Sequence, residues 1–364
     1  MKILLISDRF GWALDTLANQ LRIVLGAKLE FDVMTTSSES FAPDFLRLHP
    51  RYDVVHFMAN RAFFRWGWVT RRPCVFLLNH VHGGWKRIDE NIRYADSICV
   101  SSRQWQDNLV NRYDHLNQDV HRIYFGIDTA RFRPSPSANR ETKRELGLDS
   151  DTLILGYSIS KSSRKRVDRL WECIRALKKE QSLRFIVRLT GERWNENDIP
   201  DDISSNVILE GFLTEESMPN FYAGLDYYVC TSESEGGPYP VMESMSCGVT
   251  VLSTAVGVVP ELVRDGENGF LLHEEDVAQS FVHAIRSSGR SKELRQRIGQ
   301  HAREEVTKNF AIDIAIHASN YPLVYESASR GYSKRPSIEK MKKRLACTLY
   351  SRFRKSETMF RLLR

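Results

Sequence analysis

Two glutamates eight positions apart, Glu235 and Glu243, stand in a segment rich in glycine and proline, SESEGGPYPVMESMSCG (232–248). An ionised carboxylate is purely an acceptor, and its oxygens can take both hydroxyl donors of a vicinal diol such as a ribose or a sugar ring. The spacing alone is weak evidence, because glutamates at such a distance are common on exposed loops and helices. The elements that carry the pair must therefore decide what it does.

The segment follows an apolar run, DYYVCTS (226–232), that is typical of a buried strand. A short helix is expected over 240–247, because Pro240 suits the first helical position and Gly248 suits the left-handed position after a helix. Glu243 then lies in the first helical turn, where the helix dipole favours a carboxylate. Glu235 lies in the loop that enters the helix. Backbone amides that could offer donors to an anionic or polyhydroxyl ligand at the same place belong to Gly236, Gly237 and Tyr239.

Short apolar runs alternate with helix-period segments along most of the chain, which predicts doubly wound α/β sheets. In the first half, buried strands are expected at 1–7, 31–36, 52–59, 73–80 and 97–102. A proline-containing segment, 125–151, reads as a linker, and the alternation resumes with TLILGYS at 152–158. We therefore predict two Rossmann-like domains, with a cleft between the carboxyl ends of their sheets.

The predicted domain boundaries follow from this linker. The first domain is expected at 1–137, with 309–330 packing back on it, and the second at 138–308. The remaining segment, 331–364, is expected to be a basic amphipathic tail.

The composition is that of a soluble globular protein, with 364 residues, 42% hydrophobic and 27% charged. The opening MKILLISDRF has too short an apolar stretch for a secretory signal, and no apolar run approaches the ~18 residues of a membrane span. Six cysteines without C-x-x-C spacing indicate reduced thiols. These features predict a cytoplasmic location.

The longer run from Ser232 to Leu272 resembles the signature region of the retaining nucleotide-sugar glycosyltransferases of family 4, in which Glu235 and Glu243 match the E-x7-E element. That family has the two-domain GT-B fold. The resemblance extends to ADSICVSS (95–102), YFGIDTARFRP (124–134), RLTGE (188–192) and NVILEGFLTEESMPNFYAGLDYYVCTS (206–232), and so covers most of residues 1–330.

This resemblance implies a retaining, metal-independent hexosyltransferase that uses a nucleoside diphosphate sugar and a glycan or lipid-linked acceptor, with no cofactor. Such an enzyme would serve cell-surface polysaccharide or glycolipid synthesis. Two alternatives stay open: another GT-B enzyme, such as a nucleotide-sugar epimerase, and a non-catalytic GT-B subunit that binds a glycan. Nucleic acid is not an expected partner.

Carried over to this chain, the resemblance assigns the donor ribose to Glu243 and the hydroxyls of the transferred sugar to Glu235. It assigns sugar and phosphate contacts to the amides of Gly236, Gly237 and Tyr239, and it places Gly211 and Phe212 among the donor-binding residues. Lys165 matches the family's diphosphate-binding lysine. The family's arginine has no clear counterpart, because tyrosine and serine stand at 157–158 where a Gly-Arg pair is usual. Lys161 and Arg164 are the candidates to replace it.

In the first domain, the resemblance assigns His82 a contact to the donor sugar near the reacting carbon, and Gly11 a place in the loop near phosphate and acceptor. We expect no metal site. His80 and His82 have no carboxylate or cysteine ligand near them in sequence. The D-x-D formed by Asp149 and Asp151 is explained by a turn beside a glycine.

The tail is strongly basic, because residues 330–364 hold twelve Lys/Arg and two Glu. Its apolar residues recur on one helical face, at Ile338, Met341, Leu345, Leu349, Phe353, Phe360 and Leu363. This pattern is typical of a helix that lies on an anionic membrane surface. A helix that docks on its own protein, or a disordered basic end, is the alternative.

Overall fold

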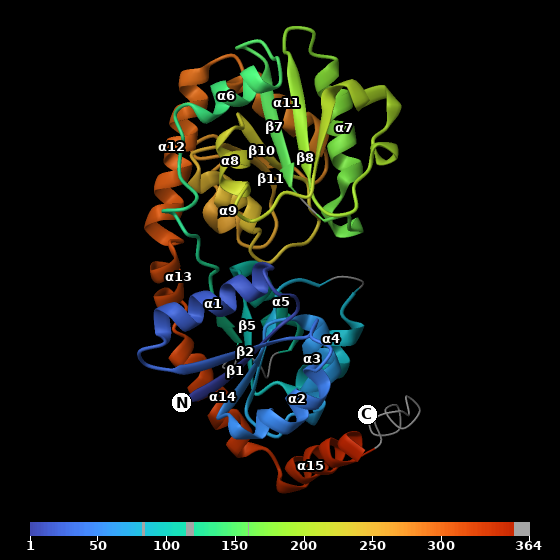
Figure 1. Cartoon of the computed structure of the whole chain (residues 1–364), viewed down its shortest axis with the longest axis vertical. Coiled ribbons are helices and arrows are strands. Elements are labelled where there is room, and N and C mark those ends of the chain that lie inside the picture. The colour runs from blue at the N-terminus through green and yellow to red at the C-terminus, as the bar shows by residue number, and fades with distance from the viewer. Residues whose placement is uncertain (82–83, 114–119, 159, 353–364) are drawn as a thin grey trace. The chain divides into compact units, whose positions relative to one another are not determined.

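The computed structural model of the chain describes residues 1–364 except 82–83, 114–119, 159 and 353–364, and the side chains of 346 and 349–352 are likewise not described. The chain forms two compact units (Figure 1). Unit 1 comprises Met1–Gly126 and Ile312–Arg364, and unit 2 comprises Ile127–Ala311.

Unit 1 is built on one sheet of six parallel strands in the order β2-β1-β3-β4-β5-β6. Its strands are β1 (Lys2–Ser7), β2 (Glu30–Thr35), β3 (Val54–Phe57), β4 (Cys74–Leu78), β5 (Ser97–Val100) and β6 (Val120–Arg122). The first five confirm the strands expected from the apolar runs. The sixth was not predicted, because three residues carry too little pattern.

Helices pack against this sheet as the alternation predicts (Figure 1). The helices before the crossing to unit 2 are α1 (Ala13–Leu25), α2 (Phe41–Leu48), α3 (Asn60–Trp66), α4 (Lys86–Asn91) and α5 (Arg103–Arg112). After the chain returns come α13 (Ile312–Ala318), α14 (Tyr321–Lys334) and α15 (Ser337–Arg352). Helix α14 contacts β4 and β5, so the returning chain completes the first domain.

The start of the predicted tail is part of unit 1. The guanidinium of Arg335 is buried against the carboxylate of Asp96, and Arg335 also pairs with Glu339 in the first turn of α15. Helix α15 contacts α2 and the 3-10 turn Gly67–Val69, and its Lys343 and Cys347 are buried. Phe353, Phe360 and Leu363 of the predicted apolar face lie outside the described residues.

Unit 2 has its own sheet of six parallel strands, in the order β12-β11-β10-β7-β8-β9. The strands are β7 (Leu153–Ser158), β8 (Phe185–Thr190), β9 (Val207–Gly211), β10 (Tyr227–Cys230), β11 (Thr250–Thr254) and β12 (Phe270–Leu272). The strand order reverses between β7 and β10. Ligands of open α/β sheets bind outside the carboxyl ends of the strands at such a reversal.

The helices of unit 2 are α6 (Ala138–Glu145), α7 (Val167–Lys178), α8 (Met218–Ala223), α9 (Tyr239–Ser246), α10 (Val259–Leu262), α11 (Val277–Ser288) and α12 (Lys292–Asn309). Helices α7 and α11 contact each other and contribute Leu170, Ile174 and Phe281 to the core. Two sheets of this kind confirm the predicted pair of Rossmann-like domains.

Unit 2 begins at Ile127, whereas the sequence analysis placed the boundary after residue 137. The segment after Ile127 belongs to unit 2 because it is bonded there. Ile127 bridges to Ala311, and the carbonyl of Phe132 accepts hydrogen bonds from the Ser246 hydroxyl (2.6 Å) and from Arg303 (3.1 Å).

In the part of the chain that the structure describes, no helix is both long and apolar enough to cross a membrane. All six cysteines are buried and free.

Candidate functional site

The loops at the carboxyl edge of the unit 2 sheet carry most of the residues that the sequence analysis selected. The loop after β7 holds Arg164 and Lys165, and the loop after β10 holds Glu235. Because β7 and β10 are neighbours in the sheet, these two loops meet at the reversal of strand order.

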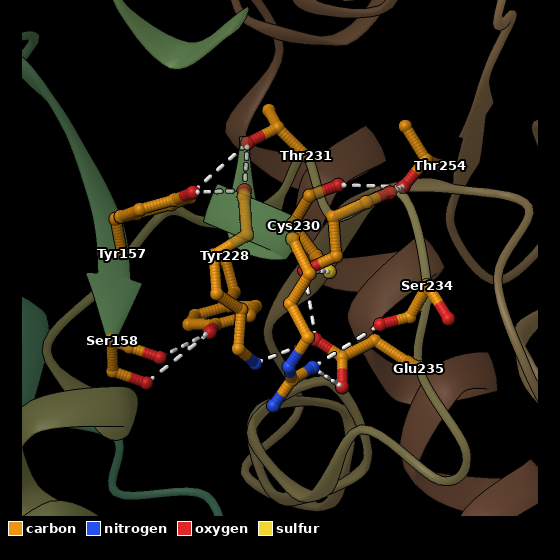
Figure 2. A network of polar contacts seen from close by, with 11 residues as sticks. Tyr157, Ser158, Tyr228, Cys230, Thr231, Ser234, Glu235 and Thr254 are labelled. Atoms are coloured by element: carbon orange, nitrogen blue, oxygen red, sulfur yellow. Dashed lines mark hydrogen bonds and ion pairs between the residues drawn. The ribbon is translucent and has the colours of Figure 1, made fainter. Parts of the chain in front are cut away.

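Glu235 is paired with two cations in this place. Its carboxylate oxygens lie 2.7 Å from a guanidinium nitrogen of Arg164 and 2.6 Å from Nζ of Lys165. The Ser232 hydroxyl donates a third contact, at 2.8 Å. Glu235 is only 6% exposed, so its carboxylate is largely withdrawn from water. Figure 2 shows the network of polar contacts around Glu235.

The cluster keeps Glu235 ionised. Burial alone would raise the pKa of this carboxyl, but the charges of Lys165 and Arg164 overcome it and hold the pKa at about 2. Two cations on one carboxylate leave one net positive charge. Such a group fits an anionic ligand that can compete with Glu235 for the two cations.

The backbone that carries these cations is fixed by hydrogen bonds from two hydroxyl groups, those of Tyr157 and Thr231. Tyr157, at the end of β7, is buried and donates to the carbonyl of Lys165 (2.9 Å), and its oxygen lies 2.9 Å from the hydroxyl of Thr231. Thr231 in turn contacts the carbonyls of Lys165 (3.2 Å) and Arg166 (3.0 Å) (Figure 2). The loop is also tied to its neighbour through the amide of Glu233, which donates to the carbonyl of Arg164 (2.8 Å).

The sequence analysis did not select Tyr157 or Thr231. The available signal was their position, because polar residues at the carboxyl ends of two adjacent central strands lie beside each other. The Ser158 hydroxyl belongs to a second cluster, in which its oxygen lies 3.1 Å from the hydroxyl oxygen of Tyr222 and 3.2 Å from that of Tyr228. Tyr157 and Ser158, two hydroxyl-bearing residues, thus stand where the family that this chain resembles usually has a Gly-Arg pair.

The two candidates for the missing arginine separate in the structure. Arg164 reaches Glu235 beside Lys165, and it also donates to the carbonyl of Ser234 (3.1 Å). Lys161 instead pairs with Asp198, and its ammonium lies 5.8 Å from the centre of the Trp194 ring.

Glu243 lies on α9, which begins at Tyr239, one residue before the predicted start. Gly248 has a left-handed φ of +76°, as expected after a helix. Burial raises the pKa of Glu243 to about 7, and a hydrogen bond with Tyr222 and the charge of Arg131 offset only part of this effect. The two glutamates therefore differ in charge state near neutral pH, with Glu235 fully ionised and Glu243 near its midpoint.

A glycine in the loop after β11 fixes the backbone beside Glu235. A Cβ on Gly257 would lie 2.0 Å from the carbonyl oxygen of Gly236 and 2.7 Å from that of Glu235, and Gly257 has a φ of +56°. The amide of the next residue, Val258, donates to the same Gly236 carbonyl (2.9 Å). Only glycine fits this contact. The sequence analysis did not select Gly257.

Gly211 ends β9 and Phe212 follows it, at the same edge of the sheet. The Gly211 carbonyl accepts from the amide of Gly191 (3.0 Å) and the hydroxyl of Thr190 (2.7 Å), which ties this turn to β8. Phe212 is 63% exposed, which is unusual for a side chain of its size. The structure thus places an unburied ring on the edge that carries the ionic cluster.

Two selected residues belong to unit 1. Gly11 follows β1, has a φ of +71°, and donates its amide to Asp15 (3.0 Å). His82 lies outside the described residues, so its role stays a prediction. The D-x-D residues Asp149 and Asp151 both pair with Arg184. Over the described ranges, no group of three or more His, Cys, Asp or Glu side chains has an arrangement that could hold a metal ion.

Residues 138–305 match the family model described as glycosyl transferases group 1. The match contains the cations at 164–165, both glutamates and Gly257. Among curated proteins, spore coat protein SA of Bacillus subtilis is 22% identical over 76% of this chain and 78% of its own length. A D-inositol 3-phosphate glycosyltransferase of Thermobifida fusca is 28% identical over 58% of this chain, which spans only about half (52%) of that relative.

A solved structure of HepE from Anabaena, in complex with UDP-glucose, matches 92% of this chain and 100% of its own, with a TM-score of 0.70 at 17% identity. At this identity the likeness establishes the fold alone, which is the GT-B fold.

Proposed function

Because residues 138–305 match the group 1 glycosyltransferases, we propose that this chain moves a hexose from a nucleoside diphosphate sugar to a hydroxyl of a glycan or lipid-linked acceptor, in polysaccharide or glycolipid synthesis. The proposal includes retention of configuration at the transferred carbon.

The observation that carries the proposal is the buried contact of Glu235 with Arg164 and Lys165. A diphosphate bound at these cations would find them already oriented by the backbone contacts of Tyr157 and Thr231. Preoriented charges beside a leaving group stabilise the transition state without a further cost of reorganisation. Arg164 and Lys165 are therefore assigned to the diphosphate.

The remaining donor groups are assigned from the same edge of the sheet. Glu243 accepts the ribose hydroxyls, and Glu235, once the diphosphate draws the cations, accepts hydroxyls of the hexose. The amides of Gly236, Gly237 and Tyr239 face sugar and phosphate at the start of α9. Phe212, being exposed, offers its ring to the base.

For the chemical step we propose attack on the same face that the leaving group departs from. The bond between the anomeric carbon and the phosphate oxygen breaks, the acceptor oxygen bonds to that carbon, and the departing phosphate takes the acceptor proton. The nucleoside diphosphate leaves with that proton. Arg164 and Lys165 balance the charge that develops on the phosphate, in line with the metal independence that the family resemblance implies.

Donor binding can be tested by thermal shift with a panel of nucleoside diphosphates and their hexoses, UDP-glucose included, because a ligand raises stability by an amount set by its affinity. One donor should stabilise the protein and be slowly hydrolysed to free sugar, also in EDTA. Lys165→Ala should reduce both effects, and Lys161→Ala is the matched control. No stabilisation by any donor, or equal effects of both variants, would contradict the proposal. Stabilisation without hydrolysis or transfer would favour the non-catalytic alternative.

We further propose that α15 lies on an anionic membrane surface, which suits a lipid-linked acceptor. Ile338, Met341 and Leu345 are 61%, 62% and 58% exposed, at the i, i+3, i+7 spacing of one helical face. Exposed Lys342 and Arg344 flank that face. A basic helix with an apolar face binds anionic bilayers through both features.

Sedimentation with vesicles of phosphatidylglycerol and phosphatidylcholine tests this second proposal. The triple variant Ile338→Ser, Met341→Ser, Leu345→Ser should lose binding, because these side chains are exposed and their loss leaves the core intact. Ile23→Ser removes a 78% exposed apolar side chain from α1 and serves as the control. Equal sedimentation of the wild type and the triple variant would refute the assignment.

A further inference from the structure

Unit 1 carries a hollow of about 430 Å³ on its surface, separate from the residues assigned above. It is lined by Trp85, at the start of α4, and by four residues of α5: Trp105, Asn108, Asn111 and Arg112. The volume lies in the range of small-ligand sites.

The two indoles supply the apolar part of the hollow. Their ring centres are 6.2 Å apart at an interplanar angle of 60°, so they meet edge to face. Trp105 is buried and Trp85 is half-buried. Both rings also contact the unit 1 core, which holds them in place. Rigid aromatic side chains of this kind give contact area at a low cost in conformational entropy.

Among the described residues of the lining, the one charged side chain is Arg112, and it is already neutralised. Arg112 forms a two-pronged pair with the carboxylate of Asp89 (2.8 and 2.7 Å), and its guanidinium lies 5.1 Å from the centre of the Trp85 ring. A guanidinium that is bound to a carboxylate and stacked on an indole is fixed in orientation. The part of the lining that the structure describes therefore has no net charge and favours a neutral ligand.

The amides of Asn108 and Asn111 complete the lining. They stand three residues apart on α5, so they point to the same side of the helix, and both side chains are exposed. Each amide offers an acceptor oxygen and two donor hydrogens. A ligand with adjacent hydroxyls, which both donate and accept, would satisfy them.

We propose that this hollow binds a sugar ring of a neutral oligosaccharide. Fixed indoles for the C–H faces, amides for the hydroxyls and a neutralised arginine together match the chemistry of an uncharged saccharide. The proposal is independent of the donor site, since a glycan would bind here whether or not the chain transfers a hexose.

Isothermal titration with neutral hexasaccharides of glucose, mannose, galactose and N-acetylglucosamine tests it. At least one should bind, and the double variant Asn108→Ala, Asn111→Ala should weaken that binding about tenfold, since each lost hydrogen bond contributes roughly threefold or more. Asp107→Ala, on α5 outside the lining, is the matched control. The thermal midpoints of the variants verify that they fold.

Three results would overturn the assignment. They are the absence of binding by every hexasaccharide, equal binding by the double variant and the wild type, and a preference for inorganic phosphate over the saccharides. A UDP-glucose thermal shift on the same samples keeps this outcome separate from the donor proposal, because the asparagine variants leave every assigned donor residue in place.

Discussion

Glu243 allows the most demanding test of the site, because its environment in the folded protein destabilises the ionised form of its carboxyl group. Its pKa is raised from 4.5 to about 7 by burial. A carboxyl whose pKa is raised on folding stabilises the fold below its unfolded pKa, and that stability is lost as the pH rises through the folded pKa. The relevant window is therefore pH 4.5 to 7, and stability falls upward through it.

The size of the effect follows from the same shift. A pKa change of one unit corresponds to about 1.4 kcal/mol, so the rise predicts a loss of about 2 kcal/mol from this one group between pH 5 and pH 8. Glu243→Gln keeps the shape of the side chain and removes the titration. Relative to the wild type, the variant should gain about 2 kcal/mol of stability over that range.

Urea unfolding of both proteins at pH 5, 6.5 and 8, followed by circular dichroism, measures this difference. Glu275→Gln removes an exposed charge from the same unit and controls for net charge. A stability difference between Glu243→Gln and the wild type that stays flat with pH would refute the reasoning. The pH dependence of donor affinity is a second measurement. Under our proposal, the ribose hydroxyls bind the ionised carboxylate of Glu243. Wild-type donor affinity should then fall about tenfold per pH unit below 7, and the variant should lose this dependence.

Three other substitutions test the support of the ionic cluster. Lys165→Ala should weaken nucleoside diphosphate binding by about ten- to a hundredfold in calorimetry, because a charge-assisted contact is lost; unchanged affinity would remove Lys165 from the diphosphate site. Tyr157→Phe should lower the urea stability of the protein by about 1–3 kcal/mol, since the carbonyl of Lys165 loses a buried donor. Gly257→Ala should destabilise the protein by about 2 kcal/mol more than Gly266→Ala. Gly266 has a similar φ of +73° but open space where Gly257 meets backbone, so equal effects would deny that the contact with Gly236 matters.

Much of the fold could be predicted because buried parallel strands have continuous apolar runs in their sequence. The first five strands and the helix that carries Glu243 were predicted within a few residues of their observed bounds. The short strand β6 has three residues and gives no usable pattern. The start of unit 2 at Ile127 was also missed, because it depends on contacts with α12 and Ala311 that are distant in sequence.

The site residues also divide into those that could be predicted from the sequence and those that could not. Glu235, Glu243 and Lys165 could be selected because a motif and a resemblance marked them. Tyr157 and Thr231 could not, because a tyrosine in an apolar strand reads as core until the neighbouring strand is known. Gly257 acts only through its closeness to Gly236, which lies more than twenty positions earlier.

The two glutamates that match one motif are thus chemically unlike. Arg164 and Lys165 keep Glu235 ionised. In the absence of a ligand, the negative charge of Glu235 offsets part of the positive charge of these two cations. In the proposed donor site, a diphosphate would displace this carboxylate from its cations, and diphosphate binding would then be coupled to the release of Glu235 toward the sugar. Glu243 has no ion pair among the described residues, and its pKa is about 7, so its charge changes with pH near neutrality. Diphosphate recognition should therefore respond mainly to salt and ribose recognition mainly to pH, and titrations that vary one condition at a time can separate the two.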